Sequence, residues 1–276
     1  MTRKWNMVID VALCHDCNNC FLACKDEYVG NDFKGFSAAQ PWFGQRWMNV
    51  ERKERGQFPM VQVAYLPTPC MHCDDAPCLT KDGAVEKRKN GLVIIDPKKA
   101  KGRKEIVGSC PYGVIYWNEE TQLPQKCTGC AHLIDDGWTE TRCTQVCPTG
   151  ALKLVLAEDE VMAARGQAEG LEAYRAELGT NPRVWYKNLH RWTHSFVGGT
   201  VAYQDTDECA EAAIVLLWSG GVKVAEAVTN NYGDFVIDKL VPGKYEVSVN
   251  APGYLTASRV VDVKESVNLG VLFLEK

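Results

Sequence analysis

Twelve of the thirteen cysteines lie within the first 147 residues, and their spacing is typical of ligands for iron–sulfur clusters. The first run is Cys14-x2-Cys17-x2-Cys20-x3-Cys24, the spacing of the bacterial ferredoxin motif. In that motif three thiolates from one tight loop bind three irons of a [4Fe–4S] cube. The fourth thiolate, three residues further on, binds a different cube. The sequence therefore predicts cubane clusters, whose chemistry is one-electron transfer.

Four further cysteine groups follow: Cys70-x2-Cys73-x4-Cys78, Cys110-Pro111, Cys127-x2-Cys130 and Cys143-x3-Cys147-Pro148. Paired ferredoxin motifs exchange their fourth ligands, and applying that rule gives three clusters. We predict a first set of Cys14, Cys17, Cys20 and Cys147, a second set of Cys127, Cys130, Cys143 and Cys24, and a third set of Cys70, Cys73, Cys78 and Cys110. These sets use every cysteine of the five groups.

Zinc ligation and disulfide bonding fit these cysteines less well. A zinc-stabilised structural module also uses Cys-x2-Cys pairs, but zinc does not need three cysteines in seven residues. A disulfide framework is typical of small secreted domains, and the sequence carries no secretory leader. Iron–sulfur clusters are therefore the favoured interpretation, with zinc as the alternative.

The pattern resembles the four-cluster ferredoxin-like electron-transfer subunits of dimethyl sulfoxide reductase-type molybdopterin oxidoreductases, over about residues 5–157. The resemblance implies tandem ferredoxin-like modules and a large catalytic partner subunit with molybdenum bis-MGD. The likeness is greatest to the small subunits of pyrogallol–phloroglucinol transhydroxylase and resorcinol hydroxylase. It is carried by Cys14-His-Asp-Cys-Asn-Asn-Cys20, Arg46-Trp-Met-Asn-Val-Glu-Arg52, Thr68-Pro-Cys-Met-His-Cys73 and Cys110-Pro-Tyr-Gly113.

That likeness implies a heterodimer, or a multiple of it, that hydroxylates or transhydroxylates polyphenols anaerobically. Substrate chemistry would belong to the large subunit, so we assign no catalytic residue to this chain. One alternative partner is a respiratory molybdenum reductase for a sulfoxide, polysulfide or oxyanion.

One cluster of the family pattern has lost its ligands. The segment from Asp96 to Gly113 resembles the family's third cysteine group, yet Ala100, Arg103 and Ile106 occupy the positions where that group has cysteines. Asp82 occupies the partner position. Because a buried charge requires a partner, we expect Asp82 and Arg103 to approach each other in the vacated space. The alternative is that both face solvent.

Short strands and turns should position the cysteine groups. We expect strands at residues 5–13, 91–96, 113–117 and 150–155, and a helix over 158–178 followed by an extended stretch. The insertion over residues 25–69 contains Trp42, Phe43, Trp47 and Phe58. We expect these aromatic side chains to pack on the protein core, with contact to a partner as the alternative.

From about Phe196 the sequence changes to short alternating runs separated by Asn231-Tyr-Gly, Val241-Pro-Gly and Ala251-Pro-Gly. Six or seven strands over about 80 residues predict a small antiparallel β-sandwich. The runs resemble transthyretin-like or carboxypeptidase-regulatory-like domains, for which a structural or docking role is expected. The fold class is thus α+β, with a cluster domain at 1–157, a linker at 158–195 and a β-sandwich at 196–276.

Several polar residues adjoin the cysteine groups. His15, His72 and His132 either form hydrogen bonds near cluster sulfurs or pack at the surface. Lys126 and Arg142 either raise a cluster's potential or lie in solvent, and the lone Cys209 is expected to be buried and inert. The basic run Lys98-Lys99-Lys101-Arg103-Lys104 is most simply a solvated loop, with docking of a partner protein as the second possibility.

Charge and hydrophobicity argue against a nucleic-acid-binding or membrane-spanning protein. The net charge of −4 gives no overall attraction for nucleic acid, and no apolar stretch reaches the roughly 18 residues of a membrane span. The N-terminus has neither a hydrophobic leader nor a twin arginine. These features favour the cytoplasm. Export with a leader-bearing partner to the periplasm is the alternative.

Overall fold

The computed structural model describes residues 2–276, which divide into two compact units. The first unit consists of Met1–Glu51 and Tyr65–Leu189, and the second of Arg52–Ala64 and His190–Lys276. Strands β2 (Asn49–Gln57) and β3 (Met60–Thr68) pair as a hairpin whose distal part is counted with the second unit. Across residues 2–276, no helix is both long and apolar enough to cross a lipid bilayer.

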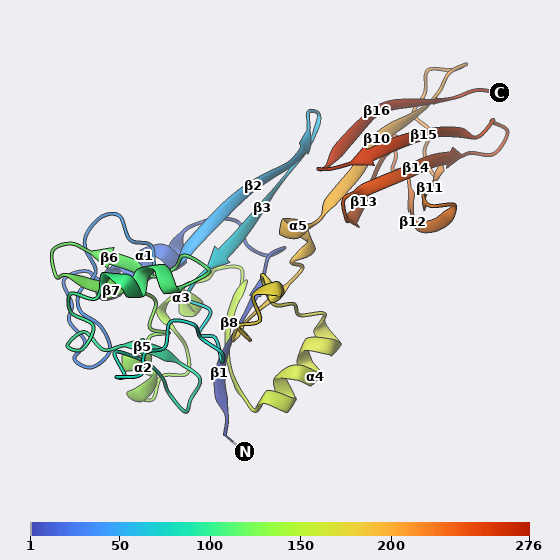
Figure 1. The fold of residues 1–276 in the computed structure, drawn as a ribbon. Helices are drawn as coiled ribbons and strands as arrows, with labels where there is room; N and C mark the ends of the chain where they lie inside the picture. Colours follow the sequence, from blue (N-terminus) through green and yellow to red (C-terminus); the bar gives the residue numbers. More distant parts are fainter. Residues whose placement is uncertain (1) are drawn as a thin grey trace. The chain divides into compact units, whose positions relative to one another are not determined.

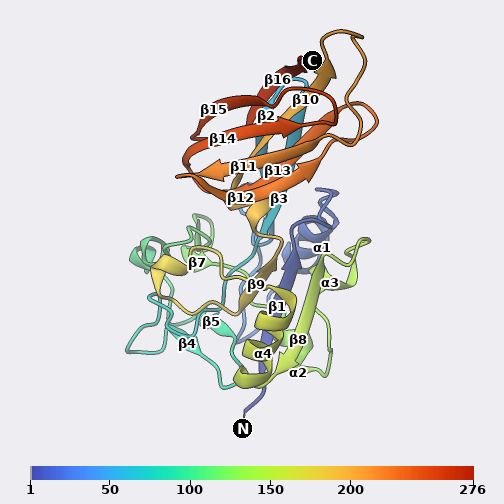
Figure 2. The ribbon, with the colours of Figure 1, turned by 90° about the vertical axis from the view of Figure 1, so that its right-hand side faces the viewer.

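The longest strands of the first unit form a three-stranded sheet. Its central strand β1 (Lys4–Asp10) pairs antiparallel with β8 (Leu152–Ala157) and parallel with β9 (Val184–Lys187). Helix α4 (Asp159–Glu169) covers this sheet, as Figure 2 shows, and inserts Met162 against Val8 and Ala157. The sheet places the ends of β1 and β8 next to the first and last cysteine groups.

The helix expected over residues 158–178 is shorter than predicted, because α4 ends at Glu169. Gly170 follows in the left-handed conformation with φ 63°, a backbone state that glycine adopts at helix ends without steric cost. The amide of Leu171 then donates to the Gly166 carbonyl at 2.8 Å, which closes the last turn. A short 3₁₀ turn, η2 (Ala176–Leu178), is all that remains of the second half of the predicted helix.

The rest of the first unit is made of short elements joined by turns. Strands β4 and β5 pair antiparallel, as do β6 and β7. β6 begins three residues later than expected, because Gly113 has φ 67° and closes a turn onto the Cys110 carbonyl. The elements are α1 (Asn19–Tyr28), β4 (Val85–Lys87), β5 (Val93–Ile95), η1 (Lys104–Ser109), β6 (Tyr116–Asn118), β7 (Leu123–Gln125), α2 (Ala131–Asp135) and α3 (Arg142–Gln145).

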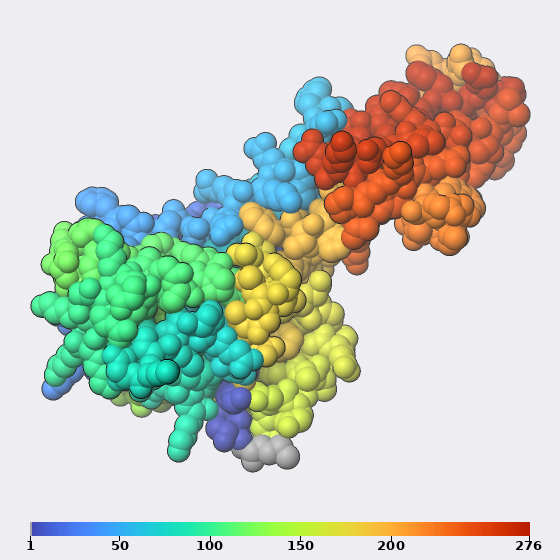
Figure 3. Space-filling model, in the orientation of Figure 1, coloured from blue at the N-terminus to red at the C-terminus, as the bar shows by residue number. Residues whose placement is uncertain are grey.

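Segments distant in sequence lie side by side in this unit. The Tyr112 hydroxyl is 2.8 Å from the Thr180 hydroxyl, and Arg175 donates to the Pro111 carbonyl at 2.8 Å. Figure 3 shows the corresponding yellow and green segments in contact at the surface. The stretch after α4 thus packs against the turn that contains Cys110.

The second unit is a two-layered β-sandwich preceded by the helical turn α5 (His190–Thr193). One sheet has the order β13-β10-β16 and the other β12-β11-β14-β15 (Figures 1 and 2). The strands are β10 (Ser195–Tyr203), β11 (Ile214–Ser219), β12 (Val222–Val228), β13 (Asp234–Leu240), β14 (Gly243–Asn250), β15 (Ala257–Val263) and β16 (Val267–Leu274). Inward-facing aliphatic side chains, among them Val215, Leu217 and Val247, are fully buried between the layers.

The sandwich is not wholly antiparallel, although the strand pattern of the sequence predicts that it should be. The first strand, β10, pairs in parallel with the last, β16. The pairing follows from connectivity: β15 ends at the edge of the four-stranded sheet, and the chain then crosses to the other layer. There it runs beside β10 in the same direction, and parallel neighbours arise only through such crossovers.

Candidate metal centres

The first set of cysteines comes together around the loop that follows β1. Cys14, Cys17, Cys20 and Cys147 line one hollow. The loop is tight because Asp16 and Asn18 adopt φ of 55° and 60°, a conformation that these two residue types tolerate better than most. Asn18 reinforces it by donating to the Asp16 carbonyl at 2.9 Å. Cys17 is the exposed member of the set.

The thiols of the first set have unequal proton affinities. Burial, with the charges of Cys14, Cys17 and Cys147, raises the pKa of Cys20 to about 11. Burial acts the same way on Cys147, but hydrogen bonds from the Leu152 amide and from Thr149 outweigh it, so the pKa of Cys147 is lowered. Amide donors at a sulfur stabilise the thiolate, which is the form that binds metal.

The second set is the most deeply buried. Cys24 lies on α1, Cys130 directly precedes α2 and Cys143 lies on α3. Burial, reinforced by the charges of Cys127, Cys130 and Cys143, holds the pKa of the Cys24 thiol well above its ordinary value. Burial also raises the pKa of Cys130 to about 12. Gln40 Nε2 lies 3.7 Å from the Cys24 sulfur and can donate to it.

The third set lines a second hollow. Its walls include Cys70, Cys73, Cys78 and Cys110. Burial raises the pKa of Cys78 to about 11, although the nearby charge of Lys126 opposes the increase. The amide of His72 donates to the Cys70 sulfur at 3.4 Å.

The four cysteines of the first set line one hollow and those of the third set line another, and Cys127, Cys130 and Cys143 lie near enough to Cys24 to affect its pKa. The assignment of one cluster to each set stays a prediction. Burial, and after it the charges of neighbouring thiolates, raises the pKa values of Cys20, Cys24 and Cys78, so bound cationic iron would favour the thiolate form. Four soft sulfur donors around one hollow are the donor set of a [4Fe–4S] cube. Among residues 2–276, no three His, Cys, Asp or Glu side chains are placed to hold a single metal ion.

Ordinary side chains occupy the positions at which the family pattern predicts the ligands of a fourth cluster. Ala100 and Ile106 are 0% and 3% exposed and belong to the protein core. Arg103 contacts Asp82 at 2.7 Å and Glu105 at 2.8 Å, so the predicted approach of Asp82 and Arg103 is confirmed. The premise of a buried pair was wrong, because 61% of the Asp82 side chain is exposed. Hydrogen bonds from Thr80, the Ala84 amide and Arg103 lower the pKa of Asp82 to about 2.

The three histidines differ in environment. His15 is exposed. His132 stacks on Phe33, with ring centroids 3.7 Å apart, and its Nε2 is 2.8 Å from a Glu27 carboxylate oxygen. His72 is buried between Cys70 and Cys73, and burial together with the charges of Lys126 and Lys87 lowers its pKa. Surface packing is therefore wrong for His72.

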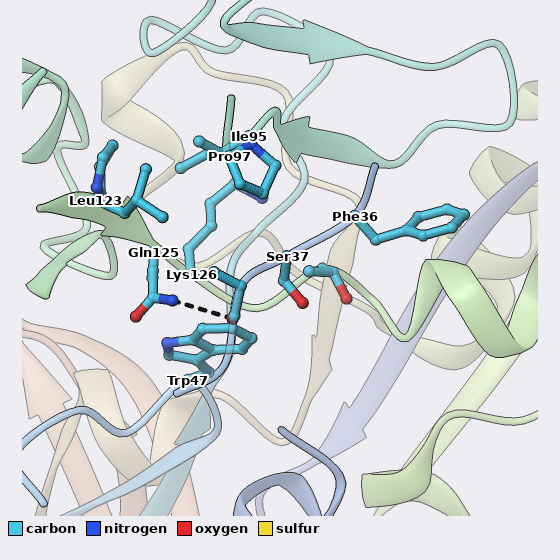
Figure 4. A pocket seen from close by; sticks show the side chains of 11 residues that line it. Phe36, Ser37, Trp47, Ile95, Pro97, Leu123, Gln125 and Lys126 are labelled. Carbon is cyan, nitrogen blue, oxygen red and sulfur yellow. Dashed lines mark hydrogen bonds between the residues drawn. The ribbon is translucent and has the colours of Figure 1, made fainter. Parts of the chain in front are cut away.

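Lys126 is buried rather than solvated, so one of the two interpretations from sequence is wrong. Its Nζ donates to the Val93 carbonyl at 2.5 Å and to the Cys127 carbonyl at 3.0 Å. The side chain lines the hollow of the third set and also the hollow in Figure 4, which Trp47 and Leu123 share. The other cation, Arg142, pairs with Glu27 at 3.0 Å.

Two expectations about burial were wrong. Of the four aromatic residues in the insertion, only Trp47 is in the core, whereas Trp42, Phe43 and Phe58 are 77%, 89% and 91% exposed. Cys209 is exposed rather than buried; it lies in the connection between β10 and β11 and forms an isolated bridge with Ala202 of β10. Composition could not separate these positions, because aromatic and cysteine residues are buried on average but not at every site. In the basic run, Lys98, Lys99, Lys101 and Lys104 are exposed, as predicted.

Comparison with known proteins identifies related sequences for both parts of the chain. Residues 61–157 match the model of a 4Fe-4S dicluster domain, and residues 197–273 that of a carboxypeptidase regulatory-like domain. The pyrogallol hydroxytransferase small subunit of Pelobacter acidigallici is 48% identical over 99% of this chain and 100% of its own.

More distant relatives match a smaller part of the chain. The arsenate respiratory reductase iron-sulfur subunit of Shewanella sp. (strain ANA-3) is 29% identical, over 66% of this chain and 95% of its own. The thiosulfate reductase electron transfer subunit of Salmonella typhi is 30% identical, over 69% of this chain and 96% of its own.

Proposed function

The chain belongs to the iron–sulfur electron-transfer subunits of dimethyl sulfoxide reductase-family molybdenum oxidoreductases, together with the small subunit of pyrogallol hydroxytransferase, and we propose that it serves a hydroxytransferase of that kind. In this proposal it carries three [4Fe–4S] clusters and docks on a large subunit that holds molybdenum bis-MGD. The large subunit would hydroxylate or transhydroxylate polyphenols of the pyrogallol, phloroglucinol or resorcinol type.

The observation that carries the proposal is the extent of the similarity to the hydroxytransferase small subunit. The hydroxytransferase small subunit matches 99% of this chain, whereas the respiratory subunits described above match 66% and 69%. The full-length relative therefore shares the carboxypeptidase-regulatory-like part as well as the dicluster part. This extent favours a hydroxytransferase partner over a respiratory reductase.

The cysteine geometry supports the cluster count. We propose that the first, second and third sets each hold one cube, with Cys147 and Cys24 exchanged between the first and second sets. When bound, the clusters supply one-electron transfer at potentials set by their surroundings. The chain's own residues hold the thiolates in place, bury most of the second set and direct amide donors at sulfur, as His72 does at Cys70 and Gly129 does at Cys127.

No residue of this chain is proposed to act on substrate. A transhydroxylation has no net redox change, so electrons from this subunit would set or restore the oxidation state of molybdenum. A hydroxylation would require electron transfer through this subunit in every turnover. The second unit would serve assembly or docking.

The proposal is tested by anaerobic purification of the native complex. We expect about twelve irons per chain, from three cubes of four irons, with a co-purifying large subunit that contains molybdenum and acts on pyrogallol or phloroglucinol. A complex that reduces arsenate or a sulfur compound but leaves polyphenols unchanged would contradict the choice of substrate. A colourless chain that contains zinc and no sulfide would contradict the electron-transfer role itself.

A further inference from the structure

Two buried polar side chains connect the second and third sets, and both are anchored on Val93. The Val93 amide donates to His72 Nδ1 at 2.9 Å, and the Val93 carbonyl accepts from Lys126 Nζ at 2.5 Å. His72 belongs to the loop of the third set, whereas Lys126 directly precedes Cys127 of the second set. Each side chain therefore belongs to the loop of one set, and the Val93 backbone holds its polar end near the other set.

Lys126 carries a buried charge without a carboxylate partner. It is 3% exposed, and none of the ion pairs among residues 2–276 includes it. Two carbonyls accept from its Nζ, but carbonyl dipoles alone compensate a buried ammonium poorly. Its side chain lines the hollow surrounded by the four cysteines of the third set. Its charge acts on the Cys78 thiol of that hollow and also on Cys127 of the second set.

Lys87, the other lysine near the third set, differs from Lys126 in having a carboxylate partner. Its Nζ also approaches the third set, donating to the Cys73 carbonyl at 2.8 Å, but it pairs with Asp74 at 2.5 Å. Arg183 shares the same carboxylate. The charge of Lys87 is thus compensated within the protein, and the charge of Lys126 is not.

His72 has a buried donor without a partner. Because Nδ1 accepts from Val93, the ring proton must be on Nε2. Within residues 2–276, Nε2 is buried and has no hydrogen-bond partner, which is uncommon for a buried donor. This atom lies against Gly129 of the second-set loop, 3.2 Å from the position that a Cβ would occupy there. A hollow that adjoins it is lined by Gly129 and Cys127 of the second-set loop and also by Cys70 of the third set.

We propose that His72, Val93 and Lys126 form a crossed bridge between two clusters. Lys126, from the second-set loop, supplies positive charge to the cluster of the third set. His72, from the third-set loop, donates its Nε2 hydrogen to a sulfur of the cluster of the second set. Both interactions stabilise the reduced cluster and raise its potential. The bridge rests on the proposed function, because it requires clusters at both sets.

The test is an electron paramagnetic resonance redox titration of the full complex. Cys110→Ser and Cys24→Ser variants, whose serine ligands alter one cluster each, assign the signals of the third and second sets. Lys126→Gln keeps a hydrogen-bond donor and removes the charge, so the potential of the third-set cluster should shift downward the most. Lys98→Gln removes the same charge from an exposed side chain. This control variant should leave the potentials of all clusters unchanged.

His72→Asn keeps an acceptor for the Val93 amide and removes the Nε2 donor. Asparagine also tolerates the left-handed backbone of His72, whose φ is 44°. We expect a downward shift of the second-set cluster, and recovery in His72→Gln, whose amide can place a donor near the position of Nε2.

The test is whether each variant shifts the potential of the cluster bound by the other loop: Lys126→Gln that of the third set, and His72→Asn that of the second. The bridge would be overturned if Lys126→Gln left the cluster potentials unchanged. It would also be overturned if His72→Asn shifted only the potential of the third-set cluster. If Lys126→Gln lowers iron content, loss of the third-set cluster supports the bridge. Loss of the second-set cluster, whose ligand Cys127 adjoins Lys126, would reveal only a structural role and overturn it. Wild-type protein without three clusters would instead refute the proposed function.

Discussion

The two units differ in what holds the backbone in place. In the second unit, the strands from β10 to β16 have six to nine residues and enclose a continuous aliphatic core. In the first unit, β4, β5, β6 and β7 have three residues each, and turns lead from one cysteine group to the next. Paired strands and a continuous apolar core hold the second unit, whereas the first unit combines smaller apolar clusters with three sets of cysteines, several of them buried.

The difference shows how metal ligation can replace hydrophobic burial. Burial and mutual repulsion hold the pKa values of Cys24 and Cys143 well above the ordinary value of a thiol, which disfavours thiolates packed together without cations. Binding of metal to such groups contributes directly to the free energy of folding. We therefore expect the stability of the first unit to depend on iron and that of the second to be independent of it.

Removal of iron should have the largest effect. Anaerobic chelation of the full chain should abolish protection of backbone amides from hydrogen exchange across residues 65–150 and leave β10–β16 protected. The measurement is hydrogen exchange followed by mass spectrometry of peptides. Equal loss of protection in both units would show that the sandwich also depends on the clusters, and retention in both would show that the first unit folds without metal.

Single cysteine substitutions should distinguish the cluster ligands from Cys209, which belongs to none of the three sets. Cys110→Ala removes one ligand of the third set, and we expect the iron content to fall by about four per chain, the content of one cube. Cys209→Ala, in the second unit, should leave iron and the visible absorption unchanged. An unchanged iron content in Cys110→Ala would remove that residue from the ligand set.

A cavity in the sandwich should affect only the second unit. Leu217 is fully buried in its core, so Leu217→Ala should lower the free energy of unfolding of that unit by about 2–5 kcal/mol without loss of iron. Leu216→Ala, on the neighbouring half-buried position, is the matched control and should cost less. Differential scanning calorimetry with iron analysis measures both, and a loss of iron in Leu217→Ala would contradict independence of the units.

The exposed Asp82–Arg103 pair should matter least. Solvent screens such pairs strongly, so Asp82→Asn should change neither iron content nor cluster potentials, and should lower the melting temperature of the first unit only slightly. Ile106→Asp, which places a charge at a buried position of the former cluster site, is the contrasting variant and should destabilise that unit clearly. A large effect of Asp82→Asn on any cluster would show that the pair still belongs to an active centre.

The cysteine groupings are the part of the site that spacing predicts most specifically, and as ligand sets they stay a prediction. Spacing alone predicted that Cys24 joins Cys127, Cys130 and Cys143, and these thiols do raise the pKa of Cys24 in the structure. Such spacing is informative because a cube demands fixed distances between its ligands. The sandwich was predictable too, from alternating runs and turn residues, apart from the parallel β10–β16 pair, which depends on long-range connectivity.

Some features were not encoded in a local pattern. The early end of α4 at Gly170 depended on whether that glycine would cap the helix or continue it. Exposure of Trp42 and Phe43 depends on which surfaces the insertion leaves uncovered. The burial of Lys126 has no signal in sequence, because lysine is mostly exposed and only tertiary contact with Val93 places it inside.

The cluster assignment requires three iron cubes, held by three sets of four cysteines with exchanged ligands. An anomalous difference map at the iron absorption edge, from crystals of the anaerobically purified complex, tests it without intermediate steps. We expect three iron peaks in this chain, one within each set, with Cys147 beside Cys14 and Cys24 beside Cys130. A fourth peak near Ala100 and Ile106, or a peak whose cysteine neighbours come from different sets, would contradict the assignment.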